Sequence, residues 1–416
     1  MEGKKVGMET KYDAIIVGAR CAGSPTAMLL ARKDYRVLLV DKATFPSDTL
    51  STHLIHPPGV AALKRWGLLE RLEATGCPPI TNYSYDFGPI TISGSPRPAD
   101  GVSEALCPRR IVLDEQLAEA AVAAGAELRE GFAVDEILVE DGQVKGIRGR
   151  TKGGATVTER ARIVVGADGR HSLVAKAVRP PRYRELPTLQ AAYYAYWSKL
   201  PTDGLEVYIR PDRQRGWGVL PTHDDLTLVV VGWPRCEFAA NRKDIEGNYL
   251  KSLDLVPEFA ERMCRATRET RFVGTGDQPN FFRKPYGPGW ALVGDAGYHK
   301  DSITAQGISD AFRDAEALAA ALDDAFAGRR QYDEAMTGYQ QARDEDALPM
   351  FELTCDFARL QPPPPEMQQL LGAVQTSQEA MDGFVSVMAS TLPVPEFFSP
   401  ENTERIIAGA RAYSVA

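Results

Sequence analysis

A glycine-containing motif near the N-terminus has the residue types of a dinucleotide-binding turn. The motif, Gly18-Ala-Arg-Cys-Ala-Gly23, stands between an apolar run at 12–17 and a helix expected at 22–33. Glycine allows a tight turn and a close approach to a diphosphate, and the amides at the helix N-terminus face its negative charge. A second apolar run at 35–40 ends at Asp41, which has the place of the carboxylate that binds the adenosine ribose.

Arg20 stands where this pattern usually has its second glycine. Its guanidinium could bind the phosphates in place of close amide contact, or it could point to solvent. A turn of this kind can also be a plain connection between a strand and a helix. The strand, the helix and Asp41 in the correct order favour a dinucleotide site.

Three further segments contain motifs at intervals along the chain. Residues 107–114 (CPRRIVLD) place an arginine at the start of an expected helix, and residues 165–172 (VGADGRHS) begin at the end of a short buried strand. Residues 294–296 (GDA) follow another short strand, and residues 305–308 (AQGI) lead into a long amphipathic helix. Together with the first motif, their order and spacing over residues 12–330 resemble the superfamily of FAD-dependent aromatic hydroxylases (group A flavin monooxygenases), geranylgeranyl reductases and flavin halogenases.

This resemblance implies an FAD cofactor and gives each motif a role. The amides and the helix N-terminus near Gly307 would stabilise the negative charge of the reduced flavin ring. The expected contacts are Gly18, Arg20, Gly23 and Asp168 near the diphosphate, Asp41 and Val134 at the adenosine with Lys42 beside them, Arg110 from its helix, Asp295 at the ribityl chain, and Gly307 and Ile308 at the flavin ring.

These motifs need a scaffold that brings distant strand ends together. Buried strands linked by helices indicate an α/β fold with a three-layer, Rossmann-like FAD-binding domain. The segment 191–233 is aromatic and rich in strand formers, which indicates an inserted mixed β-sheet substrate domain. We expect the FAD-binding domain at 12–80, 108–182 and 278–330, the substrate domain at 81–107 and 183–277, and a helical C-terminal region at 331–416.

The composition argues against several classes of protein. The 416 residues carry a formal net charge of -8, which does not suit a nucleic-acid or anionic-membrane surface. No apolar run approaches the length of a membrane helix, and the first eleven residues lack the apolar stretch of a signal peptide. Six scattered cysteines suit a reducing cytoplasm and indicate neither a disulfide framework nor a zinc site. We expect a cytoplasmic enzyme that acts on a small molecule and has no metal, nucleic-acid or membrane partner.

The resemblance implies a monooxygenase. NAD(P)H would reduce the FAD, and one atom of O2 would pass through a flavin C4a-hydroperoxide to a small aromatic or polyketide-like substrate. His53 is the candidate catalytic group, and Tyr194, Tyr196 and Trp217 are candidate pocket residues because an aromatic strand should turn one face to a core or cavity. No second glycine-rich nucleotide unit is visible, so NAD(P)H would bind transiently or a separate flavin reductase would supply the electrons.

Two other functions stay open at this level: a reductase or dehydrogenase of a hydrophobic, isoprenoid-like substrate, and a protein that keeps FAD as a structural element. Prenyl reductases carry Cys-Gly-Asp where this chain has Ser51-Thr-His53. Halogenases carry two tryptophans where this chain has Gly216 and Gly218. These departures argue against a reductase and, more strongly, against a halogenase, and the sequence leaves the oligomeric state open.

Overall fold

The apolar runs near the N-terminus form a parallel sheet in the computed structural model, which describes residues 11–415. β1 lies between β2 and β10, β7 and β20 pair in parallel outside them, and β19 adds an antiparallel edge. Runs of valine, isoleucine and leucine suit strands that are covered on both faces. The strands are β1 (Tyr12–Val17), β2 (Val37–Val40), β7 (Glu127–Arg129), β10 (Thr156–Gly166), β19 (Tyr286–Gly287) and β20 (Trp290–Leu292).

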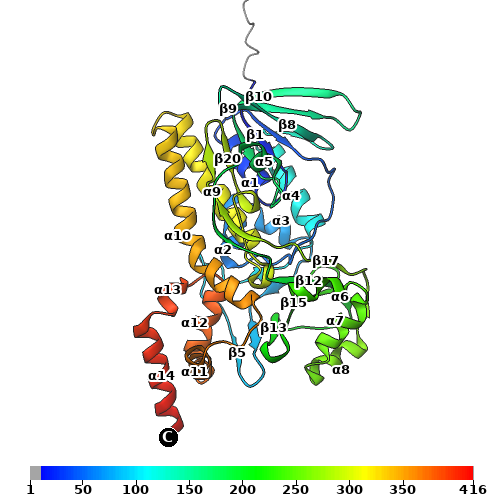
Figure 1. The fold of residues 1–416 in the computed structure, drawn as a ribbon, viewed down its shortest axis with the longest axis vertical. Helices are drawn as coiled ribbons and strands as arrows, with labels where there is room; N and C mark the ends of the chain where they lie inside the picture. Colours follow the sequence, from blue (N-terminus) through cyan, green and yellow to red (C-terminus); the bar gives the residue numbers. More distant parts are fainter. Residues whose placement is uncertain (1–10, 416) are drawn as a thin grey trace, which may run out of the picture.

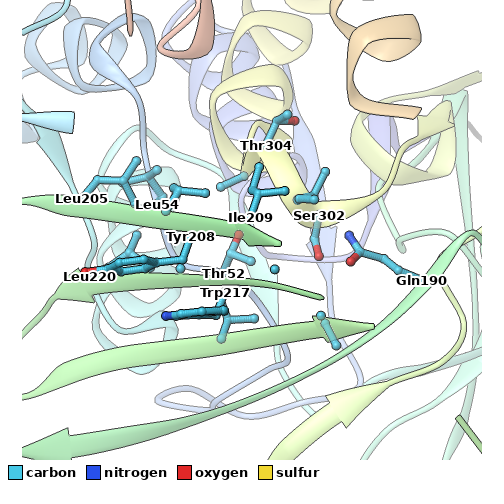
Figure 2. A pocket seen from close by; sticks show the side chains of 18 of the residues that line it. Thr52, Leu54, Gln190, Leu205, Tyr208, Ile209, Trp217, Leu220, Ser302 and Thr304 are labelled. Atoms are coloured by element: carbon cyan, nitrogen blue, oxygen red, sulfur yellow. The ribbon is translucent and has the colours of Figure 1, made fainter. Parts of the chain in front are cut away.

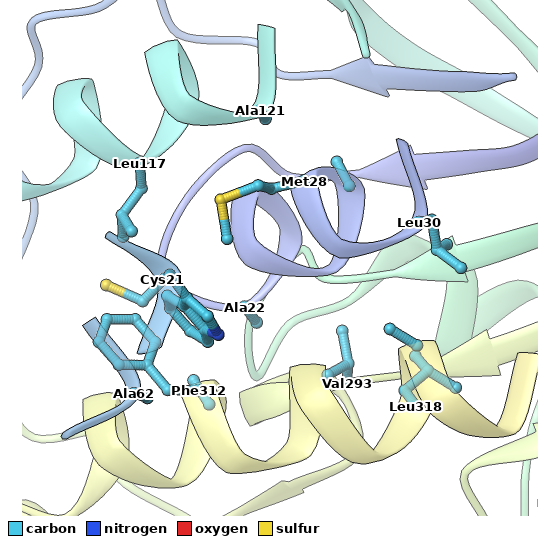
Figure 3. Close-up of a cluster of buried hydrophobic side chains, with 14 of the residues drawn as sticks. Cys21, Ala22, Met28, Leu30, Ala62, Leu117, Ala121, Val293, Phe312 and Leu318 are labelled. Atoms are coloured by element: carbon cyan, nitrogen blue, oxygen red, sulfur yellow. The ribbon is translucent and has the colours of Figure 1, made fainter. Parts of the chain in front are cut away.

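Two layers cover this sheet. Ala14 and Ile16 of β1 face a helical layer, while Ile15 and Val17 face a strand meander, as the period of two along a strand requires. Figure 3 shows α1 between α4 and α9, with Met28, Leu117 and Phe312 in the shared core. The helical layer contains α1 (Gly23–Ala31), α2 (Pro57–Trp66), α3 (Leu69–Glu73), α4 (Arg110–Ala123) and α9 (Gly307–Phe326), and the other layer contains β8 (Ala133–Glu140), β9 (Gln143–Arg150) and α5 (Leu173–Val178).

A second sheet forms the lower right part of the molecule in Figure 1. β4 and β13 pair in parallel and the other neighbours pair antiparallel, so the sheet is mixed. One face packs on α7 (Ile245–Leu253) and α8 (Pro257–Arg265). The strands are β4 (Tyr83–Asp86), β5 (Thr91–Gly94), β12 (Gln190–Ser198), β13 (Leu205–Arg210), β14 (Arg215–Pro221), β15 (Thr227–Pro234), β16 (Thr267–Arg268) and β17 (Val273–Thr275).

Helices of the C-terminal region connect the two sheets. α10 (Tyr332–Ala358) packs along α9, and later helices share an apolar core with the second face of the mixed sheet (Figure 1). These are α11 (Pro365–Val374), α12 (Gln378–Met388), α13 (Val394–Phe397) and α14 (Pro400–Val415). Small elements complete the chain: β3 (Pro79–Ile80) with β6 (Ala105–Leu106), β11 (Arg182–Leu186) with β18 (Asn280–Arg283) and β21 (Tyr298–His299), and α6 (Phe238–Asn241). Within residues 11–415, every helix is too short or too polar to cross a bilayer.

The predicted fold class is confirmed: a three-layer α/β unit, a mixed β-sheet and a helical C-terminal region. One element differs from the prediction. The sequence predicts one helix over 60–73, but Gly67 adopts the left-handed conformation (φ +75°) and ends α2 before α3 begins. A left-handed glycine satisfies the last carbonyls of a helix and stops it.

Candidate active site

The glycine turn packs directly against the GADG segment. Gly18 has a φ of +106°, and a Cβ added to it would lie 2.4 Å from the carbonyl oxygen of Ala167. A Cβ on Gly23 would lie 1.7 Å from the carbonyl oxygen of Gly18. Neither position can take a side chain without moving backbone, so the two glycines let the first and third motifs meet at the carboxyl ends of β1 and β10.

Asp41 is buried beside this turn, at the carboxyl end of β2. Its carboxylate accepts hydrogen bonds of 2.8 Å from the backbone N–H groups of Ala19 and Ala43. Lys42 is exposed, and Val134 is half-buried on β8. These contacts fix the Asp41 carboxylate at the edge where adjacent strand ends converge.

Two arginines share one buried carboxylate behind the turn. Arg110 donates to both oxygens of Asp114, at 2.9 and 3.0 Å, and Arg20 donates to the same group. Arg20 also donates to the Ser47 hydroxyl at 2.9 Å. The Arg20 guanidinium therefore does not point freely to solvent, and Asp114, which sequence reasoning did not single out, holds both cations. Two guanidinium groups are thus held beside the turn, where they can donate hydrogen bonds to an anionic ligand.

Asp295 follows β20 and approaches the same cluster. Gly294 (φ +58°) lies against the start of α1, since a Cβ added to it would be 2.8 Å from the Ala22 Cβ. The Asp295 side chain is 45% exposed. Burial lowers the pKa of the Arg110 guanidinium, and nearby anionic groups, Asp295 among them, raise it above its ordinary value. The GD element and the arginine helix therefore meet at one site.

The residues present fit an FAD molecule. Asp168 accepts from the Leu173 N–H at 2.6 Å through Oδ2, while its buried Oδ1 has no partner among the described residues and burial raises the pKa of this carboxyl. At the first residue of α9, a Cβ on Gly307 would meet no atom within 4 Å, so there is open space at this helix N-terminus. Ile308 next to it is buried. A glycine turn at a helix N-terminus, a buried carboxylate fixed beside it, a pair of arginines and open space at the start of α9 are features that suit FAD.

His53 lies in the loop after β2 and is completely buried. Its Nδ1 is 2.7 Å from the Ser51 carbonyl oxygen, which can only accept, so Nδ1 carries the proton. Nε2 therefore accepts from the Tyr196 hydroxyl, also at 2.7 Å. Burial, with Arg110 nearby, lowers the pKa of His53 to about 3, so the ring is neutral. Its φ of +66° is strained for a residue with a side chain.

An apolar cavity lies between the mixed sheet and the loop that leads into α9 (Figure 2). Strands β12 to β15 form one wall, and residues 302–305 with Thr52 and Leu54 form the other. Among the described residues that line it, none is Asp, Glu, Lys, Arg or His. The cavity therefore adjoins the expected flavin-binding turn but contains no ionisable acid or base of these types.

The aromatic residues predicted to line a pocket are placed differently. Tyr194 and Tyr196 face the cavity side of β12, yet they pack edge-on against His53 and are not part of the cavity lining. Trp217 borders the cavity, but its ring stacks on Tyr208 in the core toward α7 and α8. The alternation along β12 correctly placed Tyr194 and Tyr196 on the face of the sheet toward the cavity. The loop at residue 53 covers that end of the strand, so these two side chains contact the loop and not the cavity.

Gln190 and Asp301 form a polar corner of the cavity that sequence reasoning missed. Figure 2 shows Gln190 on one wall of the cavity and Ser302 on the other. Gln190 donates through Nε2 to Asp301, which precedes Ser302. The Ile303 N–H donates to the same oxygen of Asp301 at 3.1 Å. Burial raises the pKa of Asp301 to about 7. The only sequence signal was the polar character of residues 300–302 before the α9 turn.

A family model described as an FAD binding domain matches residues 11–351 of the chain. A 6-methylpretetramide 4-monooxygenase of Streptomyces rimosus is 28% identical over 73% of this chain and 73% of its own length. A 1H-pyrrole-2-carbonyl-[peptidyl-carrier protein] brominase of Pseudoalteromonas luteoviolacea is 24% identical over 75% of this chain and 78% of its own length. A digeranylgeranylglycerophospholipid reductase of Methanocella arvoryzae is 27% identical over 73% and 75%.

The fold agrees with this family. The solved structure of flavin-dependent brominase Bmp2 superimposes with a TM-score of 0.79 and 17% identity, over 97% of this chain and 99% of that one. Since a brominase is among the relatives, the absence of the two tryptophans at Gly216 and Gly218 does not exclude halogenation. The match over most of the chain and the converging motifs show that this protein belongs to the FAD binding domain family and is an FAD-dependent oxidoreductase.

Proposed function

We propose that this protein is a monooxygenase that hydroxylates a small aromatic or polyketide-like substrate in the cavity beside the α9 turn. The observation that carries the proposal is the position of that cavity: one of its walls, residues 302–305, leads directly into Gly307 and Ile308, which are expected to contact the flavin ring. The monooxygenase relative from Streptomyces rimosus supports the same activity.

FAD would be held by the groups that converge at the sheet edge. The turn from Gly18 to Gly23 and the N-terminus of α1 would face the diphosphate, Asp41 would bind the adenosine ribose, and Asp295 would bind the ribityl chain. When bound and reduced, FAD supplies two electrons to O2, so that one oxygen atom enters a C–H bond of the substrate and the other leaves as water.

The protein's own groups would prepare the site for this chemistry. The amides at the start of α9 would stabilise negative charge on the reduced ring. Gln306 fixes that turn, because its side chain donates to the Met388 carbonyl oxygen at 2.8 Å and accepts from the Ser390 hydroxyl at 2.9 Å. The apolar walls of the cavity would exclude water from the reacting atoms.

We expect His53 to position the cavity wall and not to take part in the reaction itself. Its neighbours Thr52 and Leu54 line the cavity, while its own ring turns away to bind Tyr196. The hydrogen bond at Nε2 holds this loop against the mixed sheet, and the bond from Nδ1 to Ser51 lies within the loop and fixes the ring. A catalytic role for His53 stays a prediction, and the geometry favours a role in positioning the cavity wall.

NAD(P)H or a separate flavin reductase would supply the electrons. The measurement that separates the candidate activities is turnover with O2, without O2, and with and without halide. A monooxygenase consumes O2 and substrate in equal amounts and ignores halide. A reductase of an isoprenoid-like substrate would turn over without O2, and that result would contradict the proposal.

Halogenation is the second candidate. The brominase relative, which matches three quarters of this chain, is the observation that favours it. In that case turnover would need both O2 and a halide ion, and the product would gain a halogen atom in place of oxygen. If product forms only when a halide is present, the protein is a halogenase and the proposed hydroxylation is wrong.

A further inference from the structure

The cavity floor is a patch of almost bare backbone. Ala192, Gly232 and Gly216 lie directly across from one another on β12, β15 and β14. Gly218, two residues along β14, lies on the same side. The Gln190 amide oxygen lies over Gly232 and the Leu360 side chain lies near Gly216, so the flat faces of the peptide groups are most open at Gly218. Leu54 and Ile303 stand on the opposite wall, so the space is a slot between the sheet and the loop.

None of the described residues that line the slot carries a charge that could neutralise a charged ligand. Its polar side chains are those of Thr52, Tyr85, Gln190, Tyr208, Trp217, Ser302 and Thr304, and its described lining includes no Asp, Glu, Lys, Arg or His. An ion transferred from water into such a space loses its hydration without gaining a counter-charge, which is strongly unfavourable. Asp301, just behind the wall, would repel an anion further when ionised.

The polar corner of the slot presents a hydrogen-bond acceptor. Gln190 donates one hydrogen of its Nε2 to Asp301, and this bond orients the amide so that its Oε1 can accept from a ligand. That oxygen lies over Gly232, since a Cβ added to Gly232 would be 2.4 Å from it. Asp301 is itself fixed, because its N–H donates to Asn280 Oδ1 at 2.7 Å. The orientation of the Gln190 amide is therefore set by the loop at 301–303.

We propose that the slot binds an uncharged, planar ring compound that directs an O–H or N–H donor at Gln190. The proposal rests on the proposed function, because it takes this cavity as the substrate site. It narrows the range of substrates: the slot would reject aromatic acids in their ionised form and bind a neutral phenol or aromatic amide. Gly218 is the residue that sets the depth of the slot.

The test is calorimetric titration of the oxidised holoenzyme at neutral pH with matched probes. We expect 2-naphthol to bind at least about tenfold more tightly than 2-naphthoate, which has the same rings and a negative charge. We expect 2-methoxynaphthalene, which lacks the donor, and farnesol, which is uncharged but not planar, to bind more weakly than 2-naphthol. Equal or tighter binding of 2-naphthoate or farnesol, or no binding of any probe, would overturn the proposal.

Two variants locate the site. A Cβ at Gly218 would have its nearest neighbour, Val230 Cγ1, at 3.4 Å, so Gly218→Val should fold, fill the slot and abolish 2-naphthol binding with the FAD content unchanged. The matched control is Gly372→Val on α11, where a Cβ meets no atom within 4 Å. Gln190→Leu should lower the affinity for 2-naphthol to that for 2-methoxynaphthalene, and the affinity for 2-methoxynaphthalene should stay unchanged. Wild-type affinity for 2-naphthol in both Gly218→Val and Gln190→Leu would overturn the assignment.

This measurement is independent of oxygenation because the enzyme stays oxidised and no electron donor is present. Preferential binding of 2-naphthoate would overturn the proposed ligand class and leave the monooxygenase function in place. Tight binding of 2-naphthol without any oxygenation by the reduced enzyme would contradict the proposed function and leave the ligand class in place.

Discussion

The Tyr196 hydroxyl donates a 2.7 Å hydrogen bond to Nε2 of His53. This bond joins β12 of the mixed sheet to the loop that follows β2, and both partners are buried. His53 keeps its other nitrogen on the Ser51 carbonyl oxygen. A neutral imidazole with a partner at each ring nitrogen thus joins the mixed sheet to this loop.

Replacement of Tyr196 by phenylalanine should therefore destabilise the protein. The change leaves His53 Nε2 buried without a donor, at a cost of about 1–3 kcal/mol in the free energy of unfolding. Denaturant unfolding measures this cost. The control is Tyr193→Phe, on the opposite face of the same strand. Equal losses in the two variants would mean that the hydrogen bond to His53 contributes nothing specific.

The pH dependence of stability should report on Asp301. Burial raises the pKa of Asp301 to about 7 in the folded chain, against about 3.9 in an unfolded one. Between these values the folded protein keeps a proton that the unfolded chain has lost, so the free energy of unfolding contributed by this group falls as pH rises. Asp301→Asn lacks this dependence and should gain stability relative to the wild type from about pH 4 to about pH 7.

Unfolding free energies of the wild type and Asp301→Asn, measured over this pH series, test the assignment. The difference should level off above the folded pKa. A difference that stays constant across the series would show that Asp301 titrates normally, and its place as a buried carboxyl beside Gln190 would be wrong.

Asp41→Ala should weaken FAD binding by about 1.5–3 kcal/mol, because one charge-assisted hydrogen bond to the ribose is lost. FAD affinity is measured by titrating apoprotein with FAD and following flavin fluorescence. Asp254→Ala removes an exposed carboxylate at the end of α7 and serves as the control. Unchanged affinity in Asp41→Ala would place the adenosine elsewhere.

Asp295→Ala should lower the melting temperature of the holoprotein and leave that of the apoprotein almost unchanged. The side chain is 45% exposed, so it contributes little to the apoprotein, whereas a ribityl contact exists only when FAD is bound. Melting curves of both forms decide the matter. Equal losses with and without FAD would identify Asp295 as a structural residue of its turn.

The converging motifs were predictable from the sequence because of a general property of parallel sheets. Gly18, Asp41, Asp168 and Asp295 each follow a buried strand, and the carboxyl ends of such strands meet at one edge. The glycine conformations and the long helix after residue 306 agree with the same pattern. The main features of the fold and the convergence of these motifs therefore follow from local signals.

The cavity was not predictable in this way because it depends on pairing between distant strands. Gln190 and Asp301 are 111 residues apart and meet only through tertiary structure. The row of Ala192, Gly232 and Gly216 depends on the register of three strands, which local patterns do not specify. In the sequence, Gly216 and Gly218 stood out only because they replace the two tryptophans of a halogenase motif. Their place in the cavity floor is visible only in the fold.

The most direct test of the account is a single turnover with isotopically labelled O2. The holoenzyme, chemically reduced so that no electron donor has to be identified, is mixed with the labelled gas and 2-naphthol in the presence of halide. The account predicts a product that carries one labelled oxygen atom and no halogen. An unlabelled product, a halogenated product, or a product formed equally well without O2 would contradict it.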